Sequence, residues 1–289
     1  MSPLACACLD VEPRLTPAQI GRAATLALRD ELLLSPKPGL VTLSSTGSHS
    51  DMDARTFMRS LLALRGYFVE IAQLGGELAP FAALERCGIA AEAQMLAATG
   101  GVNTHRGAVF QLGLLCAAAG AAGAASGAGV PITAARIRAA LIEHWGAALR
   151  ARAARPSTLP GGIAARRLGL RSASEEAAAG FPVVFELALP ALRTALALGL
   201  RPPLAQLDAL FHIIAVLDDS NLAHRGGAEG LAFAQRAARG FLAQGGAAAP
   251  YGLARAQRIG AAFVARRLSP GGAADMLASS CWLMRLGAA

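Results

Sequence analysis

Apolar residues recur at helical spacing along most of the chain. Phe57, Leu61, Leu64, Phe68 and Ile71 show a 4-3-4-3 spacing that places one apolar stripe on a helix. Similar patterns predict helices over residues 16–34, 84–98, 108–119, 133–150, 175–198, 204–217, 228–243, 252–267 and 270–286. No stretch of useful length alternates apolar with polar residues, as a half-buried strand would. We therefore predict an all-α protein.

The composition strengthens this prediction. Hydrophobic residues make up 54% of the 289 residues, but only 5% are aromatic, and much of the apolar content is Ala. Ala is the best helix former, whereas strands favour β-branched and aromatic residues. Because no stretch resembles a linker, we expect one large multi-helix domain over residues 1–289, with residues 1–15 frayed.

Local signals mark where a helix begins and where a long loop interrupts the pattern. Thr16, Pro17 and Gln19 match an N-cap, a first-turn proline and a capping-box partner. Residues 35–53, SPKPGLVTLSSTGSHSDMD, contain two Pro, two Gly and five Ser, which predicts a loop. A loop of this length inside a compact domain is often functional.

Charge and cysteine patterns narrow the class of protein. The net charge is +8, but no basic run is interleaved with aromatic residues, so we expect no nucleic-acid partner. Five Cys without paired spacing favour neither a disulfide framework nor a zinc site. The N-terminus lacks the basic segment of a secretory signal, which indicates a cytoplasmic protein.

One uncharged segment is long enough for a membrane span. Residues 107–135 carry no charge, whereas a spanning helix requires roughly 20 apolar residues. The second half of the segment is Ala, Gly and Ser with little Leu, Ile or Phe. We interpret it as a buried helix through Ala119 followed by a Gly-Ala loop, and we expect no membrane partner.

The chain contains only two Asn, and each lies beside a His-Arg-Gly sequence. The stretches read GVNTHRGAVF over residues 101–110 and DDSNLAHRGG over residues 218–227. We interpret them as two walls of one pocket, in which Asn and His contact ribose or a metal-bound water. Arg would bind phosphate, and Gly would leave room for it. The residues concerned are Asn103, His105, Arg106, Asn221, His224 and Arg225.

Carboxylates gather at junctions between loops and helices, at Asp51, Asp53, Asp218, Asp219 and Asp275. Asp53 continues the apolar stripe of the helix that follows it, and Asp218 continues the stripe of the helix that precedes it. A carboxylate at a core-facing position needs a cation or several donors. Mg²⁺ takes oxygen ligands and shares them with phosphates, so the first four predict a magnesium site. Helix capping and surface ion pairs are the alternative explanation.

Lys37 is the only lysine among 27 basic residues. Its position between two prolines indicates a compact ammonium held on a stiff loop for phosphate binding, although a lysine retained by chance is the alternative. His49 follows in the same loop, and the spacing of His49, His105 and His224 is not that of a zinc site. The sequence contains no P-loop, dinucleotide-binding glycine motif or nucleophile elbow.

Six motifs follow one another along the chain: SPKPGLV, GSHSDMD, TGGVNTHRGAVF, AAAGFP, DDSNLAHRGG and SPGGAADMLA. Together they resemble the triphosphoribosyl-dephospho-CoA synthase family, from about Leu33 to Ala278. The chain departs from the family at Thr42, where Asp is usual. Before GFP, Arg171 and either Glu175 or Glu176 match the family only with a shift.

The resemblance implies a specific reaction. Members of this family are all-helical and join ATP to 3′-dephospho-CoA. The 2′-hydroxyl of the dephospho-CoA ribose attacks C1 of the ATP ribose, and adenine leaves. The product is the precursor of the prosthetic group on the acyl carrier protein of malonate decarboxylase or citrate lyase. The stand-alone, Arg- and Ala-rich chain is closer to the malonate decarboxylase branch.

The resemblance also implies roles for residues and partners. The triphosphate would be held by Mg²⁺ and by Lys37, Arg106, Arg171 and Arg225. The proton of the attacking hydroxyl would go to Asp51, Asp219 or His49. An acyl-carrier-protein transferase would receive the product, and both a monomer and a homodimer are open. Two other functions stay open, a Mg²⁺-dependent helical hydrolase of the ADP-ribose type and a non-catalytic binder of CoA-like nucleotides.

Overall fold

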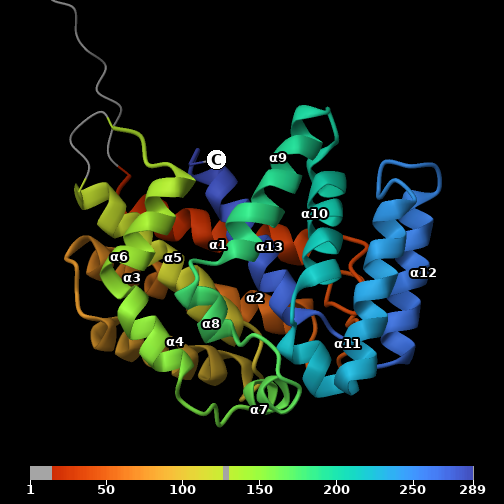
Figure 1. Cartoon of the computed structure of the whole chain (residues 1–289), viewed down its shortest axis with the longest axis horizontal. Coiled ribbons are helices and arrows are strands. Elements are labelled where there is room, and N and C mark those ends of the chain that lie inside the picture. Colours follow the sequence, from red (N-terminus) through yellow and green to blue (C-terminus); the bar gives the residue numbers. More distant parts are fainter. Residues whose placement is uncertain (1–14, 126–129, 289) are drawn as a thin grey trace, which may run out of the picture.

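The computed structural model describes residues 15–125 and 130–288, which fold into closely packed helices (Figure 1). Within these residues there are thirteen α-helices and one π-helix, and the only β-type pairing is an isolated bridge between Thr42 and Ser45. The all-α prediction is therefore confirmed. The expectation of a frayed N-terminus falls almost entirely on residues 1–14, which lie outside the described part.

Short-range signals set several of the helix boundaries. Thr16 caps α1 and forms a capping box with Gln19, as predicted. Asp53 caps α2 and Thr133 caps α6 through their side chains. The elements in chain order are α1 (Pro17–Leu33), α2 (Ala54–Ala63), α3 (Arg65–Gly76), α4 (Phe81–Thr99), α5 (Arg106–Ala125), α6 (Ala134–Ala153), α7 (Pro160–Arg167), α8 (Ala173–Ala178), η1 (Val183–Ala188), α9 (Leu189–Ala197), α10 (Pro202–Val216), α11 (Ser220–Ala243), α12 (Gly252–Ala265) and α13 (Gly271–Arg285).

Helix α5 lies at the centre of the first half of the fold. It is apolar on nearly all sides and packs against α1, α3, α4, α6 and α13, as expected for a core helix. Of the described helices, α5 alone is long and apolar enough to cross a membrane, and 78% of its apolar window is buried inside the fold. The helix ends at Ala125, six residues beyond the predicted end at Ala119, because Ala residues continue it.

Glycines allow α3 and α5 to approach backbone to backbone. A Cβ on Gly75 would lie 2.0 Å from the carbonyl oxygen of Ala117, and one on Gly120 would lie 2.0 Å from that of Ala72. Any larger side chain at either position would force the two helices apart. This contact fixes the position of α5, which begins within the first Asn-containing stretch.

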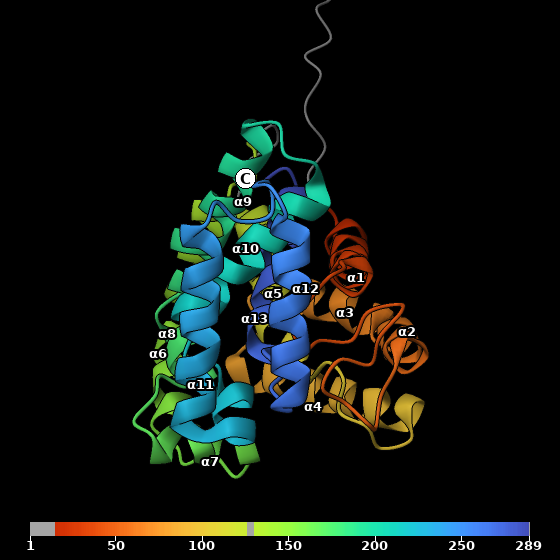
Figure 2. The same ribbon diagram turned by 90° about the vertical axis from the view of Figure 1, so that its right-hand side faces the viewer.

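The second half of the fold is built around α10, which packs against α9, α11 and α13. Helices α11 and α12 form a hairpin along one edge of the molecule, and the two helices are seen side by side in Figure 2. Helix α13 contacts α1 and α5 as well as α9 and α10, so it joins the two halves. The N-terminus of α13 therefore lies where both halves meet.

Three helices begin or break at other positions than the sequence pattern predicts. Helix α7 lies in a stretch where the apolar pattern predicts no helix, and it starts at Pro160, which has the fixed φ of a first helical residue. Helix α11 starts at Ser220, eight residues before the predicted 228, and bends at Gly227 with a φ of 61°. The helix expected over 57–71 is two helices, α2 and α3, that meet at Leu64.

The single helix predicted over residues 175–198 is wrong. It ends after Ala178 because Gly180 and Phe181 have positive φ values of 75° and 50°. The chain then forms the π-helix η1 before α9 begins. Phe181 is fully buried, so its packing in the core offsets an unfavourable backbone conformation.

We predict that Gly75→Ala lowers the free energy of unfolding by about 1–3 kcal/mol, because the new methyl group would overlap the backbone of α5. The matched control is Gly66→Ala in the same helix, where no atom lies within 4 Å of the new Cβ. That control should be neutral or up to about 1 kcal/mol more stable. Denaturant unfolding of both variants tests this, and equal effects would contradict the close α3–α5 contact.

Candidate functional site

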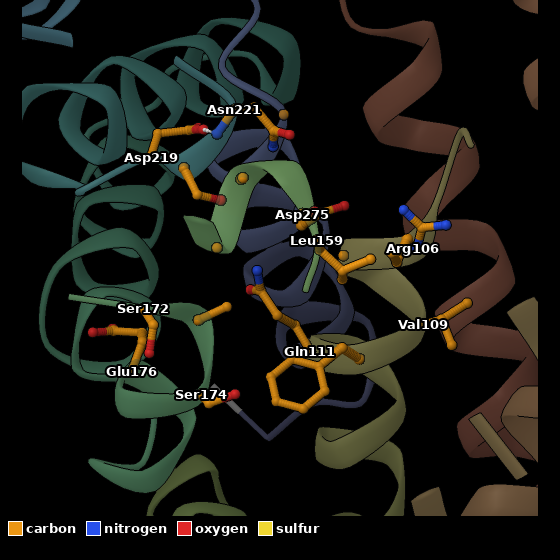
Figure 3. A pocket seen from close by; sticks show the side chains of 18 of the residues that line it. Arg106, Val109, Gln111, Leu159, Ser172, Ser174, Glu176, Asp219, Asn221 and Asp275 are labelled. Atoms are coloured by element: carbon orange, nitrogen blue, oxygen red, sulfur yellow. Dashed lines mark hydrogen bonds between the residues drawn. The ribbon is translucent and has the colours of Figure 1, made fainter. Parts of the chain in front are cut away.

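A cavity of about 1110 Å³ opens between the two halves of the fold. The starts of α5, α11 and α13 line it, as do α7, α8 and the end of α6, and Figure 3 shows labelled side chains of α5, α8 and α13 around it. Both Asn-containing stretches line it, so the two segments predicted to form one pocket do lie on one cavity. Pockets for small ligands usually measure about 300–1,000 Å³, so this one has room for more than one nucleotide.

The cavity is suited to anions at the end where the three helices start. The first N–H groups of a helix carry partial positive charge, and α5, α11 and α13 each begin with a residue that lines the cavity or lies next to one. Arginines add full positive charges around the same cavity: Arg106, Arg152, Arg155, Arg166, Arg171 and Arg225. Nine Asp and Glu side chains line the cavity as well, so polyphosphate would bind where the arginines and the helix starts outweigh them.

Asp219 joins the starts of α11 and α13. Its side chain is 1% exposed, and Oδ1 accepts hydrogen bonds from the backbone N–H groups of Asn221 at 2.8 Å and Leu222 at 3.2 Å. Oδ2 accepts from the N–H of Ala273 at 3.0 Å. Burial raises the pKa of Asp219, while these backbone donors act in the opposite direction. Both oxygens are therefore engaged in holding two helices together.

The other three predicted metal ligands each have a different position or partner. Asp53 is exposed and caps α2 by accepting from the N–H of Thr56 at 2.8 Å, which lowers the pKa of its carboxyl group. Asp218 accepts from the N–H of Arg171 at 3.0 Å, and Asp51 lies at the mouth with 56% of its side chain exposed. Among the described residues, no three His, Cys, Asp or Glu side chains converge on a point that could hold a metal ion.

The end of α10 explains why Asp218 does not face the core as the apolar stripe predicts. Leu217 leaves the helix with an extended backbone, φ −67° and ψ 134°, so the helical phase of the apolar stripe stops there. Asp218 is therefore half-buried rather than core-facing, and the buried residue is its neighbour Asp219. Asp51 and Asp218 are the two predicted ligands that line the cavity without capping a helix.

His49 and Arg225 tie the loop of residues 35–53 to α11. Nη2 of Arg225 donates to Nδ1 of His49 at 3.0 Å, and Nε2 of His49 lies 2.9 Å from the hydroxyl of Ser269. Nη1 of Arg225 donates to the carbonyl oxygens of Ser48 at 3.0 Å and Arg267 at 3.3 Å. Burial and the charge of Arg225 lower the pKa of His49, so His49 is neutral with both nitrogens engaged.

The first Asn-containing stretch shows a similar use of its arginine. Asn103 accepts from the N–H of Arg106 at 3.2 Å and thereby caps the start of α5. Nε and Nη2 of Arg106 lie 2.5 Å from Oε1 of Glu92 on α4. The guanidinium is about 29% exposed and lines the cavity, so it can also contact a ligand.

His105 is buried against α2 and carries no charge. Its Nδ1 lies 2.6 Å from the hydroxyl of Ser60, and its ring packs edge-on against Phe57. Burial, followed by the charge of Lys37, lowers the pKa of His105 to about 3. His105 therefore contributes no positive charge for binding phosphate at physiological pH, but it can still act as a neutral hydrogen-bonding group.

The remaining predicted residues lie at the cavity edge or behind its wall. Arg171 donates to Glu176 at 3.0 Å, and Asn221 and His224 are exposed and line the cavity. Lys37 is different, because it is buried and its Nζ donates to the carboxylate and the carbonyl oxygen of Glu31, each at 2.6 Å. Glu31 lines the cavity and Lys37 lies behind it, so Lys37 does not face a ligand there.

The sequence assigned no role to Asp275, which the structure places inside the cavity. It is half-buried near the start of α13, and the N–H of Ala108 donates to its carboxyl group. Burial raises its pKa well above the ordinary 3.8, and the negative charges of Glu31 and Asp219 raise it further. A carboxyl group with a raised pKa in a cavity is a candidate for acid–base catalysis. Its place in the SPGGAADMLA motif was the available signal.

Gly107 makes room for this carboxyl group. A Cβ on Gly107 would lie 1.9 Å from Oδ2 of Asp275, so any other residue would displace the aspartate. The glycine that was expected to leave space for a ligand therefore leaves space for an acidic side chain.

We predict that Lys37→Met lowers the free energy of unfolding by about 3–5 kcal/mol, because it leaves the carboxylate of Glu31 buried without its cation. The double variant Lys37→Met/Glu31→Gln should recover part of this loss. Thermal and denaturant unfolding measure both variants. A stable single variant with only a weakened ATP affinity would instead assign Lys37 to phosphate binding.

Two comparisons with known proteins concern the family of the chain. A family model described as ATP:dephospho-CoA triphosphoribosyl transferase (CitG) matches residues 17–289. A protein of Citrobacter koseri described as a probable 2-(5″-triphosphoribosyl)-3′-dephosphocoenzyme-A synthase is 40% identical over 270 residues, which covers 90% of this chain and 88% of the relative. No solved structure matches the chain. With almost its whole length matched, the chain belongs to the family of ATP:dephospho-CoA triphosphoribosyl transferases.

Proposed function

We propose that the cavity binds ATP and 3′-dephospho-CoA together and transfers the triphosphoribosyl group of ATP to the 2′-hydroxyl of dephospho-CoA. The observation that carries this proposal is one cavity of about 1110 Å³ with three helix N-termini at one end and a half-buried carboxyl group of raised pKa, Asp275, within it. Two nucleotides need such a volume, and the triphosphate needs the cationic end.

The triphosphate would lie against the starts of α5, α11 and α13, where Arg106, Arg171 and Arg225 line the cavity. Asp51 or Asp218 would bind a Mg²⁺ ion that arrives with ATP, because both line the cavity and Mg²⁺ commonly binds one or two carboxylates and keeps phosphate and water ligands. The ion would supply positive charge to the phosphate oxygens. Asp53 and Asp219 would not take part, since their oxygens cap helices.

Asp275 would carry the proton of the reaction. The 2′-hydroxyl loses its proton to the carboxylate of Asp275 as its oxygen bonds to C1, and the bond between C1 and N9 of adenine breaks. Adenine leaves with the electron pair of that bond and takes up a proton. A carboxylate nearby also stabilises the positive charge that develops at C1. Asp51 at the mouth is the second candidate for the base, and Asp219 would first have to release its backbone donors.

We also infer the wider context of the reaction. The product would pass to a transferase that loads the acyl carrier protein of malonate decarboxylase, in the cytoplasm. Conversion of that carrier protein to its active form, by product and transferase, would support this branch. Conversion of the citrate lyase carrier protein alone would assign the product to the other branch. Gel filtration with light scattering distinguishes a homodimer from a monomer.

The proposed reaction is tested with purified protein, ATP, Mg²⁺ and dephospho-CoA, with mass spectrometry of the products. We expect release of adenine that depends on dephospho-CoA, together with the triphosphoribosyl adduct. CoA in place of dephospho-CoA should give less product if the site excludes the 3′-phosphate. Ribosyl products from water alone would indicate a hydrolase, and tight dephospho-CoA binding without turnover would indicate a binding protein.

We predict that Asp275→Asn lowers kcat by about 10²–10⁴-fold while the protein remains folded. The folded state holds the proton of Asp275 above pH 3.8, where the unfolded chain loses it, so stability falls as pH rises through this window. Asp275→Asn removes this pH-dependent loss of stability. The melting temperature of the variant minus that of the unsubstituted protein should therefore increase as pH rises.

Asp208→Asn is the matched control. Burial also raises the pKa of Asp208, but this residue lies outside the cavity and accepts from the N–H of Ala247 at 2.7 Å. Its substitution should alter stability and leave kcat within a few-fold. Equal losses of kcat in the two variants, or full activity of Asp275→Asn, would remove Asp275 from the chemistry.

A further inference from the structure

Three buried polar atoms between residues 104 and 111 lack a hydrogen-bond partner among the described residues. They are Oγ1 of Thr104, Nε2 of His105 and Oε1 of Gln111, and all three residues line the cavity. Leaving a buried polar group unpaired costs about 1–3 kcal/mol. Such groups are rare in folded proteins, and unpaired polar atoms on a cavity wall indicate a ligand that supplies the missing partners.

Gln111 is the most informative of the three. It is 4% exposed and is the only amide in α5, whose sequence after Arg106 is otherwise Ala, Gly, Leu, Val, Phe and Cys. Figure 3 shows its side chain extending from α5 into the cavity, between Ser172 and Glu176 on one side and Leu159 on the other. Asp275 and Asp219 lie farther towards the helix starts in the same view.

The face of α5 that carries Gln111 is uncharged. Gly107 and Leu114 lie about one turn before and after Gln111, and both line the cavity. A flat ring would therefore contact small or apolar groups on its faces and an amide at its edge. An amide carries no charge, so it is poorly suited to phosphate and well suited to a neutral heterocycle.

We propose that the Gln111 amide recognises the amino edge of an adenine ring of a bound substrate. The amide oxygen accepts from the 6-amino group and the amide N–H donates to the adjacent ring nitrogen, a pairing that only adenine among the common purines offers in this order. This proposal rests on the proposed function, under which both substrates carry adenine. The ring that leaves belongs to ATP, and the ring that stays belongs to dephospho-CoA.

The test combines a change in the base with a change in the residue. Equilibrium binding is measured by calorimetry for ATP and its 6-oxo analogue ITP, and for dephospho-CoA and its hypoxanthine counterpart. Each pair is compared on the unsubstituted protein and on Gln111→Leu. The matched control is Gln94→Leu, which changes an exposed glutamine on α4 outside the cavity.

We expect the unsubstituted protein to prefer the amino purine by about 5- to 150-fold in one of the two pairs. In Gln111→Leu this ratio should fall to near 1, and in Gln94→Leu it should be retained. The pair whose ratio collapses identifies which adenine Gln111 contacts. A ratio unchanged by Gln111→Leu in both pairs, or no preference for adenine in the unsubstituted protein, would overturn the proposal.

Gln111→Glu guards against loss of folding, because it keeps the shape of the side chain while it replaces the amide NH₂ group with a carboxyl oxygen that cannot donate when ionised. It should reduce the ratio, with a melting curve that remains cooperative. Binding requires no turnover, so the two proposals can fail separately. A collapsed ratio without any triphosphoribosyl adduct would retain the adenine subsite and reject the transferase reaction.

Discussion

The buried carboxylate of Asp219 is the interaction on which the arrangement of the site depends. It accepts backbone hydrogen bonds from the start of α11 and the start of α13, two helices whose N-termini are 51 positions apart in the chain. A single negative charge thereby brings two positive helix ends together. The backbone donors offset the cost of burying Asp219, and the two helix starts that it joins line the same cavity as the start of α5.

The same region brings three acidic side chains close together. Asp275 lies near Asp219 and Glu31, and burial together with these two charges raises its pKa. Nζ of Lys37 donates to the carboxyl group of Glu31 from behind the wall. The three carboxyl groups differ in their partners. Glu31 has a cation and Asp219 has several backbone donors, whereas Asp275 has one backbone donor and a pKa well above 3.8. Lys37 thus influences the cavity through Glu31, without facing it.

The features that depend on short-range signals could be predicted from the sequence. Thr16 and Gln19 form the expected capping box, and the apolar spacing of residues 57–71 predicts helices whose positions 61, 64, 68 and 71 are buried. The roles that depend on tertiary contacts could not. Asp219 rather than Asp218 is buried because the chain leaves α10 at Leu217, and Asp275 becomes perturbed only when α1 and α11 lie beside it. The apolar periodicity of the sequence predicts neither the burial of Asp219 nor the raised pKa of Asp275.

The two Asn-containing stretches share one structural requirement, close contact with residues 268–275. A Cβ on Gly107 would meet Asp275, and one on Gly226 would lie 2.5 Å from the Leu268 side chain. The preceding arginines bind neighbouring elements, Arg106 through Glu92 and Arg225 through the carbonyl oxygens of Ser48 and Arg267. In both stretches the Arg therefore binds a neighbouring element, and the Gly allows close packing against residues 268–275. A triphosphate that approaches these arginines competes with partners they already have. The N–H groups of Asn221, Leu222 and Ala273 likewise already donate to Asp219, so binding of a triphosphate must exchange existing contacts for contacts to phosphate oxygens.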